Sequence, residues 1–164
     1  MLAVILGDLD SFDSLILRLL SRNGRLSVTD LAREIGLSKT PTQVRLKRLE
    51  VEGYITGYQA IIDPIRLGRD HVAFVEVRLT DTRESALKMF NLAAQKVSEI
   101  EECHMLASQF DYLLKVRTQN MQDFRKVLGE DISALPFVAH TSTHVAMETV
   151  KEGGQWSSEI NAVF

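Results

Sequence analysis

Hydrophobic residues in the first 53 positions recur every three or four residues, which is the spacing of an amphipathic helix. The pattern predicts three short helices, over residues 10–21, 27–35 and 40–52. In each of them the apolar residues are expected to form one inward face. The residues predicted to pack together in this helical unit are Phe12, Leu15, Ile16, Leu19, Leu20, Leu31, Ala32, Ile35, Val44, Leu46, Leu49 and Val51.

Polar residues mark where the second and third helices begin. Ser27 and Asp30 have the spacing of a capping box, in which side chains satisfy the free N–H groups of the first turn. For the third helix the predicted N-cap is Thr40, followed by Pro41 at the favoured first position and Gln43 as the capping-box partner. Two capped helices joined by a tight, glycine-led turn are typical of a helix-turn-helix.

The hydrophobic period changes to two at His71. Four strands and two amphipathic helices follow in the order βαββαβ, which predicts a ferredoxin-like domain. The strands are expected over 71–80, 100–107, 112–118 and 138–150, and the helices over 84–97 and 121–132. Between the two regions, residues 54–62 hold two β-prone runs broken by Gly57, which predict a small wing or hairpin.

These elements define an α+β fold class with two domains. The expected boundaries are 9–62 for a winged helix-turn-helix domain, 63–70 for a linker, 71–152 for the ferredoxin-like domain and 153–164 for a flexible tail. Residues 1–6 are apolar but lack a basic flank, so a short arm or an upstream start codon is favoured over a signal peptide. No apolar run reaches the ~18 residues of a membrane helix. The single cysteine, Cys103, suits a reducing cytoplasm.

Charge is unevenly distributed along the chain. The net charge is −3, but the segment 38–49 holds four Lys or Arg residues and no acid. A local basic field acts within a Debye length of about 8–10 Å, so it can attract DNA even in an acidic protein. A basic helix face by itself is more often a solvated surface, but the second helix of a helix-turn-helix enters the major groove. The predicted DNA contacts are Ser27, Thr29, Ser38, Lys39, Thr40, Thr42, Gln43, Arg45, Lys47 and Arg48.

The residue types in this set suit base and phosphate recognition. Gln43 can pair with adenine, and lysine or arginine can pair with guanine. Arg45 and Arg48 share a flank and are expected to reach base edges or phosphates. Ser27 and Thr29, at the start of the preceding helix, are expected to contact phosphates through side chains and free backbone N–H groups.

Motifs for catalysis and metal binding are missing from the sequence. Cys103 and His104 are neighbours on a strand and point to opposite faces, so they cannot share one ion. His140 and His144 lie on one face but about 13 Å apart. We therefore expect neither an enzyme nor a cofactor or metal site.

Several segments resemble the leucine-responsive regulator/asparagine-regulator (Lrp/AsnC) family, in the family's order and spacing from about Leu9 to Lys151. They are residues 9–17, 23–27, 30–38, 45–50, 53–58, 101–104, 110–115 and 135–136. The resemblance implies a winged helix-turn-helix and an ACT/RAM-like domain, in a transcriptional regulator of amino-acid metabolism. It also implies three partners: double-stranded DNA, a small effector that is usually an amino acid, and further copies of the chain. Members of the family pair through their sheets and commonly gather into tetramers or octamers.

The resemblance further implies an effector site between subunits, near the turn that joins the second and third strands. The corresponding residues are Met105, Ala107, Ser108, Gln109 and Asp111, with Met121, His144, Val145 and Ala146 near the same pocket. The family usually has glycine in this turn, where this chain has Ala107-Ser108-Gln109. That stretch is similar to regulators of proline catabolism, so proline is the first effector to test.

Three alternatives remain open from the sequence. Asp111 can receive the ammonium group of an amino acid or simply cap its own turn, as aspartate commonly does. An architectural DNA-compacting protein without an effector would share every feature of the N-terminal half. A metabolic enzyme with a regulatory α+β domain would turn over a substrate without DNA, since ferredoxin-like folds carry many functions.

Overall fold

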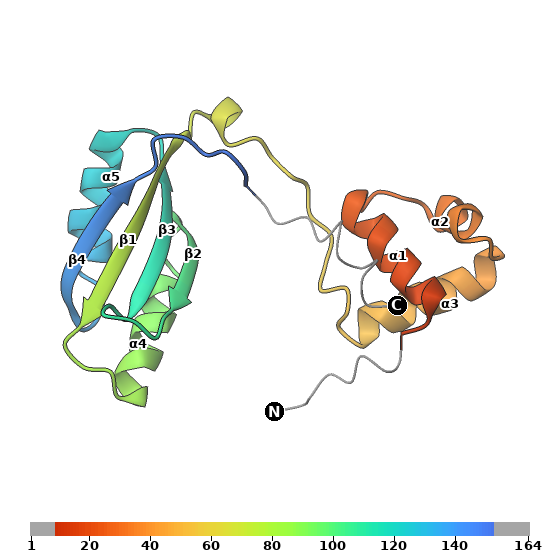
Figure 1. Cartoon of the computed structure of the whole chain (residues 1–164), viewed down its shortest axis with the longest axis horizontal. Coiled ribbons are helices and arrows are strands. Elements are labelled where there is room, and N and C mark those ends of the chain that lie inside the picture. Colours follow the sequence, from red (N-terminus) through yellow and green to blue (C-terminus); the bar gives the residue numbers. More distant parts are fainter. Residues whose placement is uncertain (1–8, 153–164) are drawn as a thin grey trace. The chain divides into compact units, whose positions relative to one another are not determined.

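The computed structural model describes residues 9–152, so the arm expected at 1–6 and the tail expected at 153–164 lie outside the described residues. The chain divides into two compact units, with the boundary after Ile61. Each unit has its own hydrophobic core, one among helices and one between a sheet and helices (Figure 1). Within residues 9–152, no helix is both long enough and apolar enough to span a bilayer.

The first unit consists of three helices around a small core. They are α1 (Ser11–Arg22), α2 (Val28–Ile35) and α3 (Lys39–Val51). Asp10 and Asp13 form a capping box at the start of α1, and Ser27 caps α2 as predicted. The buried centre, which includes four of the predicted apolar residues, is Ile16, Leu31, Ile35 and Leu49.

The start of α3 differs from the prediction. Ser38 is the N-cap and makes no side-chain capping bond, so the cap expected at Thr40 and the box expected at Gln43 are wrong. Gly36 adopts a left-handed conformation (φ 74°) and reverses the chain at once, which allows the helix to begin two residues early. Pro41 fits inside this first turn because the first N–H groups of a helix have no intrahelical partner.

Two predicted core residues of α3 lie on its surface. Val44 is 65% exposed and Val51 is 78% exposed. The helix packs inward through Thr42, Leu46 and Leu49, which recur every three or four positions. Val44 falls outside this stripe because it follows Thr42 by only two residues, about 200° around the helix.

Residues 54–62 do not form the predicted hairpin, because the structure assigns no strand to them. The Ile55 N–H donates to the Leu49 carbonyl (3.1 Å), and Tyr54 and Ile55 pack against the helical core. The Tyr58 hydroxyl donates to Glu50 (2.9 Å). This segment therefore follows the end of α3 as irregular chain, which agrees with the marginal stability of isolated two-stranded ribbons.

The second unit has the predicted βαββαβ order. Its strands are β1 (His71–Leu79), β2 (Ile100–Met105), β3 (Tyr112–Thr118) and β4 (Val138–Val145), and its helices are α4 (Glu84–Ala94) and α5 (Met121–Val127). All neighbouring strands are antiparallel, in the order β2-β3-β1-β4. A π-helical turn (Leu128–Ile132) extends α5, and a 3-10 helix (Ile65–Leu67) lies in the segment predicted as linker. Both α4 and β4 are shorter than predicted, ending at Ala94 and Val145.

Both helices cover the same face of the sheet (Figure 1). Buried residues alternate along the central strand β1, where Ala73, Val75 and Val77 face α4 and α5. The intervening residues, Phe74 and Glu76, belong to the opposite face, which neither α4 nor α5 covers. Polar and charged side chains of β3 and β4 share that face.

Candidate functional site

The start of α2 presents polar groups to solvent. The Ser27 hydroxyl accepts from the Asp30 backbone N–H (3.1 Å) and donates to the Asp30 carboxylate (2.6 Å). Thr29, in the first turn, is exposed. The Ser27 side chain is thus committed to capping, while Thr29 remains available for a phosphate.

A continuous face of α3 is exposed. Thr40, Gln43, Val44 and Lys47 recur every three or four residues and are all exposed, so they share one side of the helix. Ser38 and Lys39 are exposed at its N-terminal end. Polar groups therefore surround a single apolar side chain, Val44, which the sequence had assigned to the core.

Thr42 does not belong to this face. Its side chain is completely buried, and its hydroxyl donates to the Ser38 carbonyl (2.9 Å). A buried hydroxyl that is already bonded inside the helix cannot reach a base edge, so the prediction of Thr42 as a DNA contact is wrong.

Arg45 and Arg48 are turned toward α1. The Asp13 carboxylate, only 1% exposed, accepts from Arg45 through one oxygen (2.9 Å) and from Arg48 through the other. Arg45 also pairs with Asp10 (2.7 Å) and lies over the Phe12 ring, 5.4 Å from its centre. The two arginines thus connect α3 to the start of α1.

This arrangement changes the charge of the predicted basic segment. Hydrogen bonds that the two guanidinium groups donate to the Asp13 carboxylate raise the pKa of both arginines. The Asp13 backbone N–H, together with Arg45, lowers the pKa of Asp10. Two carboxylates therefore offset two of the four cations between Ser38 and Leu49. The sequence did not indicate that Asp10 and Asp13 contact α3, because the contact joins residues more than thirty positions apart along the chain.

The second unit has a pocket of about 300 Å³ at the end of the sheet where β2 turns into β3. Its lining residues are Thr82, Leu87, Met105, Leu106, Ala107 and Asp111. Three of these, Met105, Ala107 and Asp111, were predicted for the effector site. The pocket is largely apolar, with one carboxylate and one hydroxyl.

Asp111 caps the neighbouring strand. Its carboxylate accepts from the Leu79 backbone N–H (2.8 Å), and its own N–H donates to the Val77 carbonyl (2.9 Å). The aspartate therefore has a structural role, but its side chain bonds β1 and not the backbone of its own turn, as the sequence had offered. The side-chain bond uses one of its two oxygens, so the same carboxylate can also serve the pocket that it lines.

Ser108 and Gln109 are not among the pocket's lining residues. The Ser108 hydroxyl donates to the Phe110 carbonyl (3.0 Å) and accepts from the Phe110 N–H (3.3 Å). The Gln109 carbonyl accepts from Arg78. Both residues build the turn, and the chain by itself does not bring their side chains into the pocket.

The remaining predicted effector residues lie at the opposite end of the sheet. Val145 pairs with Ala73, and the Ala146 N–H donates to the Val72 carbonyl (2.9 Å). Met121 and His144 belong to the same end, whereas the pocket adjoins Val77 and Leu79. Six strand positions separate the two ends, about 20 Å. These residues therefore do not share one pocket within a single chain, and the expected site between subunits stays a prediction.

Metal chemistry finds no support among the described residues. No group of three His, Cys, Asp or Glu side chains within residues 9–152 is placed to hold an ion. His104 instead pairs with Glu102 (3.1 Å), and His144 pairs with Glu76 (3.2 Å).

The two units match two known domain types. Residues 9–56 match the winged helix-turn-helix DNA-binding domain, and residues 72–156 match the Lrp/AsnC ligand binding domain. These matches define a DNA-binding transcriptional regulator with a ligand-binding domain. The chain belongs to the Lrp/AsnC family, as its resemblance had indicated.

Individual relatives agree with this assignment. The proline dehydrogenase transcriptional activator of Rhizobium radiobacter is 59% identical over 90% of this chain and 94% of its own length. The leucine-responsive regulatory protein of Escherichia coli K12 is 43% identical over 90% of each chain. Among solved structures, a transcriptional regulator of Neisseria meningitidis in complex with L-Met superposes with a TM-score of 0.83, at 27% identity, over 90% of this chain and 95% of that one. The relatives are regulators and not enzymes.

Proposed function

We propose that this protein activates a gene of proline catabolism and binds its operator through α2 and α3. It senses an amino acid in the pocket beside Asp111, and proline is the first candidate. The observation that carries the proposal is the pocket itself, in which one carboxylate stands among apolar walls. Two relatives, 59% and 54% identical, are named proline dehydrogenase transcriptional activators. Acting on chromosomal DNA, the protein would work in the cytoplasm.

For the DNA interface we assign different roles to different exposed residues. Gln43 and Lys47 stand on the outer face of α3, where they can read base edges in the major groove. Lys39 and Thr29 stand at the beginnings of the two helices, where phosphate contacts are expected. Arg45 and Arg48, held by Asp13, position α3 and present their remaining donors to the phosphate wall.

Val44 adds a contact that the sequence did not suggest. It is the one apolar side chain among Thr40, Gln43 and Lys47 on that face. Apolar side chains in the major groove recognise the methyl group of thymine. We therefore assign Val44 to a thymine within the operator half-site.

For the effector, the chemistry of the pocket fits a small apolar amino acid. The Asp111 carboxylate can receive the ammonium group, while Leu87, Leu106 and Ala107 enclose the hydrocarbon part. The pocket of one chain offers no cation for the ligand's carboxylate, so we propose that a second copy completes the site. Its His144–Ala146 end, which lies far from the pocket within one chain, is the segment that the family resemblance implies.

Assembly supplies the means of regulation. The sheet face opposite α4 and α5, with Phe74, Glu76 and His144, is the surface proposed for pairing with a second copy, and further assembly into tetramers or octamers would follow. A ligand that binds one arrangement of subunits better than another changes DNA affinity by the same factor. Coupling of ~1–3 kcal/mol suffices for such a switch.

Calorimetric titration with proline, leucine and methionine tests the effector assignment. Proline is expected to bind, and Asp111→Asn to weaken binding at least tenfold, because asparagine keeps the cap on Leu79 and removes only the charge. Ser108→Ala is the matched control, since its hydroxyl is used inside the turn. Absence of proline binding, or full binding by Asp111→Asn, would refute the assignment.

Fluorescence anisotropy with the promoter of the regulated gene tests the DNA interface. Lys39→Ala and Lys47→Ala should each weaken operator binding. Where a phosphate contact is lost, the slope of the log binding constant against the log salt concentration becomes shallower by ~0.9. Lys88→Ala, on the outer surface of α4, is the control and should bind like the parent. Equal binding to operator and random DNA would instead favour an architectural protein.

A further inference from the structure

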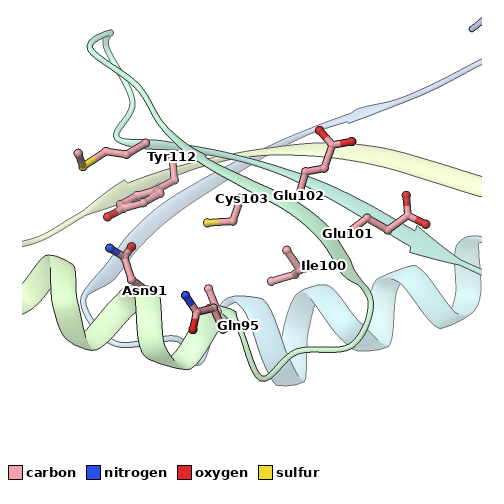
Figure 2. Close-up of a pocket in the computed structure, with 9 residues that line it drawn as sticks. Asn91, Gln95, Ile100, Glu101, Glu102, Cys103 and Tyr112 are labelled. Carbon is pink, nitrogen blue, oxygen red and sulfur yellow. The ribbon is translucent and has the colours of Figure 1, made fainter. Parts of the chain in front are cut away.

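A second pocket lies between α4 and the edge strand β2 (Figure 2). Its volume is about 520 Å³, within the range of small-molecule sites. The residues around it are Asn91, Ala94, Gln95, Ile100, Glu101, Glu102, Cys103, Met105 and Tyr112. Only Met105 is shared with the pocket beside Asp111.

The polar groups of this second pocket come from two elements that face each other. Asn91 and Gln95 are one turn apart on α4, so their amide groups project from the same side of the helix. Cys103 and Tyr112 reach down toward that helix from β2 and β3 (Figure 2). The walls therefore combine two carboxamides, a thiol and a phenol, with Ala94 and Ile100 as apolar contacts.

Tyr112 gives the pocket an unsatisfied polar group. The residue is only 1% exposed, and its ring packs on Phe90 with 4.3 Å between ring centres. Its hydroxyl points toward Asn91 but completes no hydrogen bond of ordinary geometry within the described part of the chain (Figure 2). Burying a hydroxyl without a partner is unfavourable, so this group is poised to bond an atom that enters from outside.

The two carboxylates at the rim are already neutralised. Glu101 pairs with Lys115 (3.1 Å) and with Arg117, and Glu102 pairs with His104 (3.1 Å) and Lys115 (3.5 Å). The pocket thus offers no uncompensated charge. A ligand with a net charge would lose its hydration there without gaining an ion pair, which favours a neutral, hydrogen-bonding group.

We propose that the pocket between α4 and β2 is a second ligand site, which binds a small molecule through a primary carboxamide. A carboxamide carries two donors and an acceptor, and so do the side chains of Asn91 and Gln95, which allows reciprocal pairs of hydrogen bonds. The Tyr112 hydroxyl then donates to the ligand's carbonyl oxygen. The site is separate from the proposed amino-acid effector pocket and needs no particular effector there.

Cys103 provides the measurement, because it is the only cysteine of the chain and lines the pocket. The thiol is exposed to reagent, although partial desolvation raises its pKa, so its alkylation by iodoacetamide can be followed at pH 8.5 by intact mass. The probe is L-glutamine, and L-glutamate is the matched control with the same length and a carboxylate in place of the amide. Glutamine should slow alkylation at least fivefold in a saturable manner, and glutamate should not.

Tyr112→Phe separates a binding role from a structural one. Because the hydroxyl completes no hydrogen bond of ordinary geometry with Asn91, its removal should leave the melting temperature nearly unchanged, while the glutamine concentration for half protection rises at least fivefold. Asn91→Ala, at an exposed position, should weaken protection similarly without unfolding the protein. Unaltered protection in both variants would overturn the proposal.

Two further outcomes would also overturn it. Alkylation that glutamine does not slow at any attainable concentration means that the pocket takes no carboxamide. Alkylation that slows with protein concentration, and not with glutamine, means that a second copy of the chain covers the pocket. Proline titrations run on Tyr112→Phe keep the two sites distinct, because proline binding beside Asp111 should persist whether or not the carboxamide site exists.

Discussion

Asp13 is the residue whose removal should affect the DNA-binding unit most. Its buried carboxylate accepts from the Asp10 backbone N–H, from Arg45 and from Arg48. Asp13→Asn preserves size and one acceptor but removes the charge that both guanidinium groups share. The variant therefore tests whether this cluster holds α3 on α1.

The magnitude follows from the burial of the carboxylate. Removing one partner of a fully buried ion pair costs ~3–5 kcal/mol. Arg45 is 28% exposed and can recover part of its hydration, so we expect a smaller loss, about 2 kcal/mol. In a unit this small, each kcal/mol lowers the melting temperature by ~4–8 °C, which predicts a fall of about 8–16 °C.

Thermal unfolding followed by circular dichroism gives the overall change, and hydrogen exchange locates it. Exchange should accelerate in α3, while the amides of β1 keep their protection. Glu84→Gln is the control, because the Glu84 pair with Lys88 lies on the surface of α4 and contributes little. A melting temperature within 2 °C of the parent, or exchange that accelerates equally in β1, would refute the reasoning.

Three further predictions follow from other contacts. Val44→Ala should weaken operator binding about fourfold, because a methyl-sized contact contributes ~0.8 kcal/mol. Replacing the contacted thymine by uracil should then abolish the difference in affinity between variant and parent. A difference that persists with uracil would mean that Val44 does not contact the thymine methyl group. Burial and the Glu50 carboxylate raise the pKa of Tyr58 to about 12, so its neutral form stabilises the fold at neutral pH and that stability declines as pH rises from about 10 through 12. Ultraviolet titration should show a late-ionising phenol that Tyr58→Phe deletes, and its survival in the variant would contradict the assignment. Gly36→Ala should cost ~1–2 kcal/mol because φ is +74° there, and denaturant unfolding with no loss would argue against that turn.

The predicted order of elements was confirmed because it depends on local periodicity. Positions three or four apart meet on one helix face, and positions two apart meet on one strand face, whatever the rest of the chain does. The capping residue Ser27 also acts within a few residues of its partner, so the sequence alone located it. Errors appeared in α3, where the pattern alone did not show that Thr42, and not Val44, shares the inward stripe with Leu46 and Leu49.

The candidate sites depended more on tertiary structure. The turn that contains Met105, Ala107 and Asp111 was found correctly, since all three lie in one short segment. Met121 and His144 were grouped with it by family resemblance, but sheet order places them at the other end of the domain. The residue types of the pocket between α4 and β2 gave no local signal, because β2 and α4 each contribute only one wall.

The sequence by itself thus determined the helix-turn-helix, the βαββαβ order and the turn beside Asp111, because neighbouring residues encode them. Only the folded chain decided that Arg45 and Arg48 bind Asp13 and that Tyr112 meets Asn91 across a cavity. The physical reason is that charge pairing and desolvation depend on which distant segments come together, and spacing along the chain does not record that.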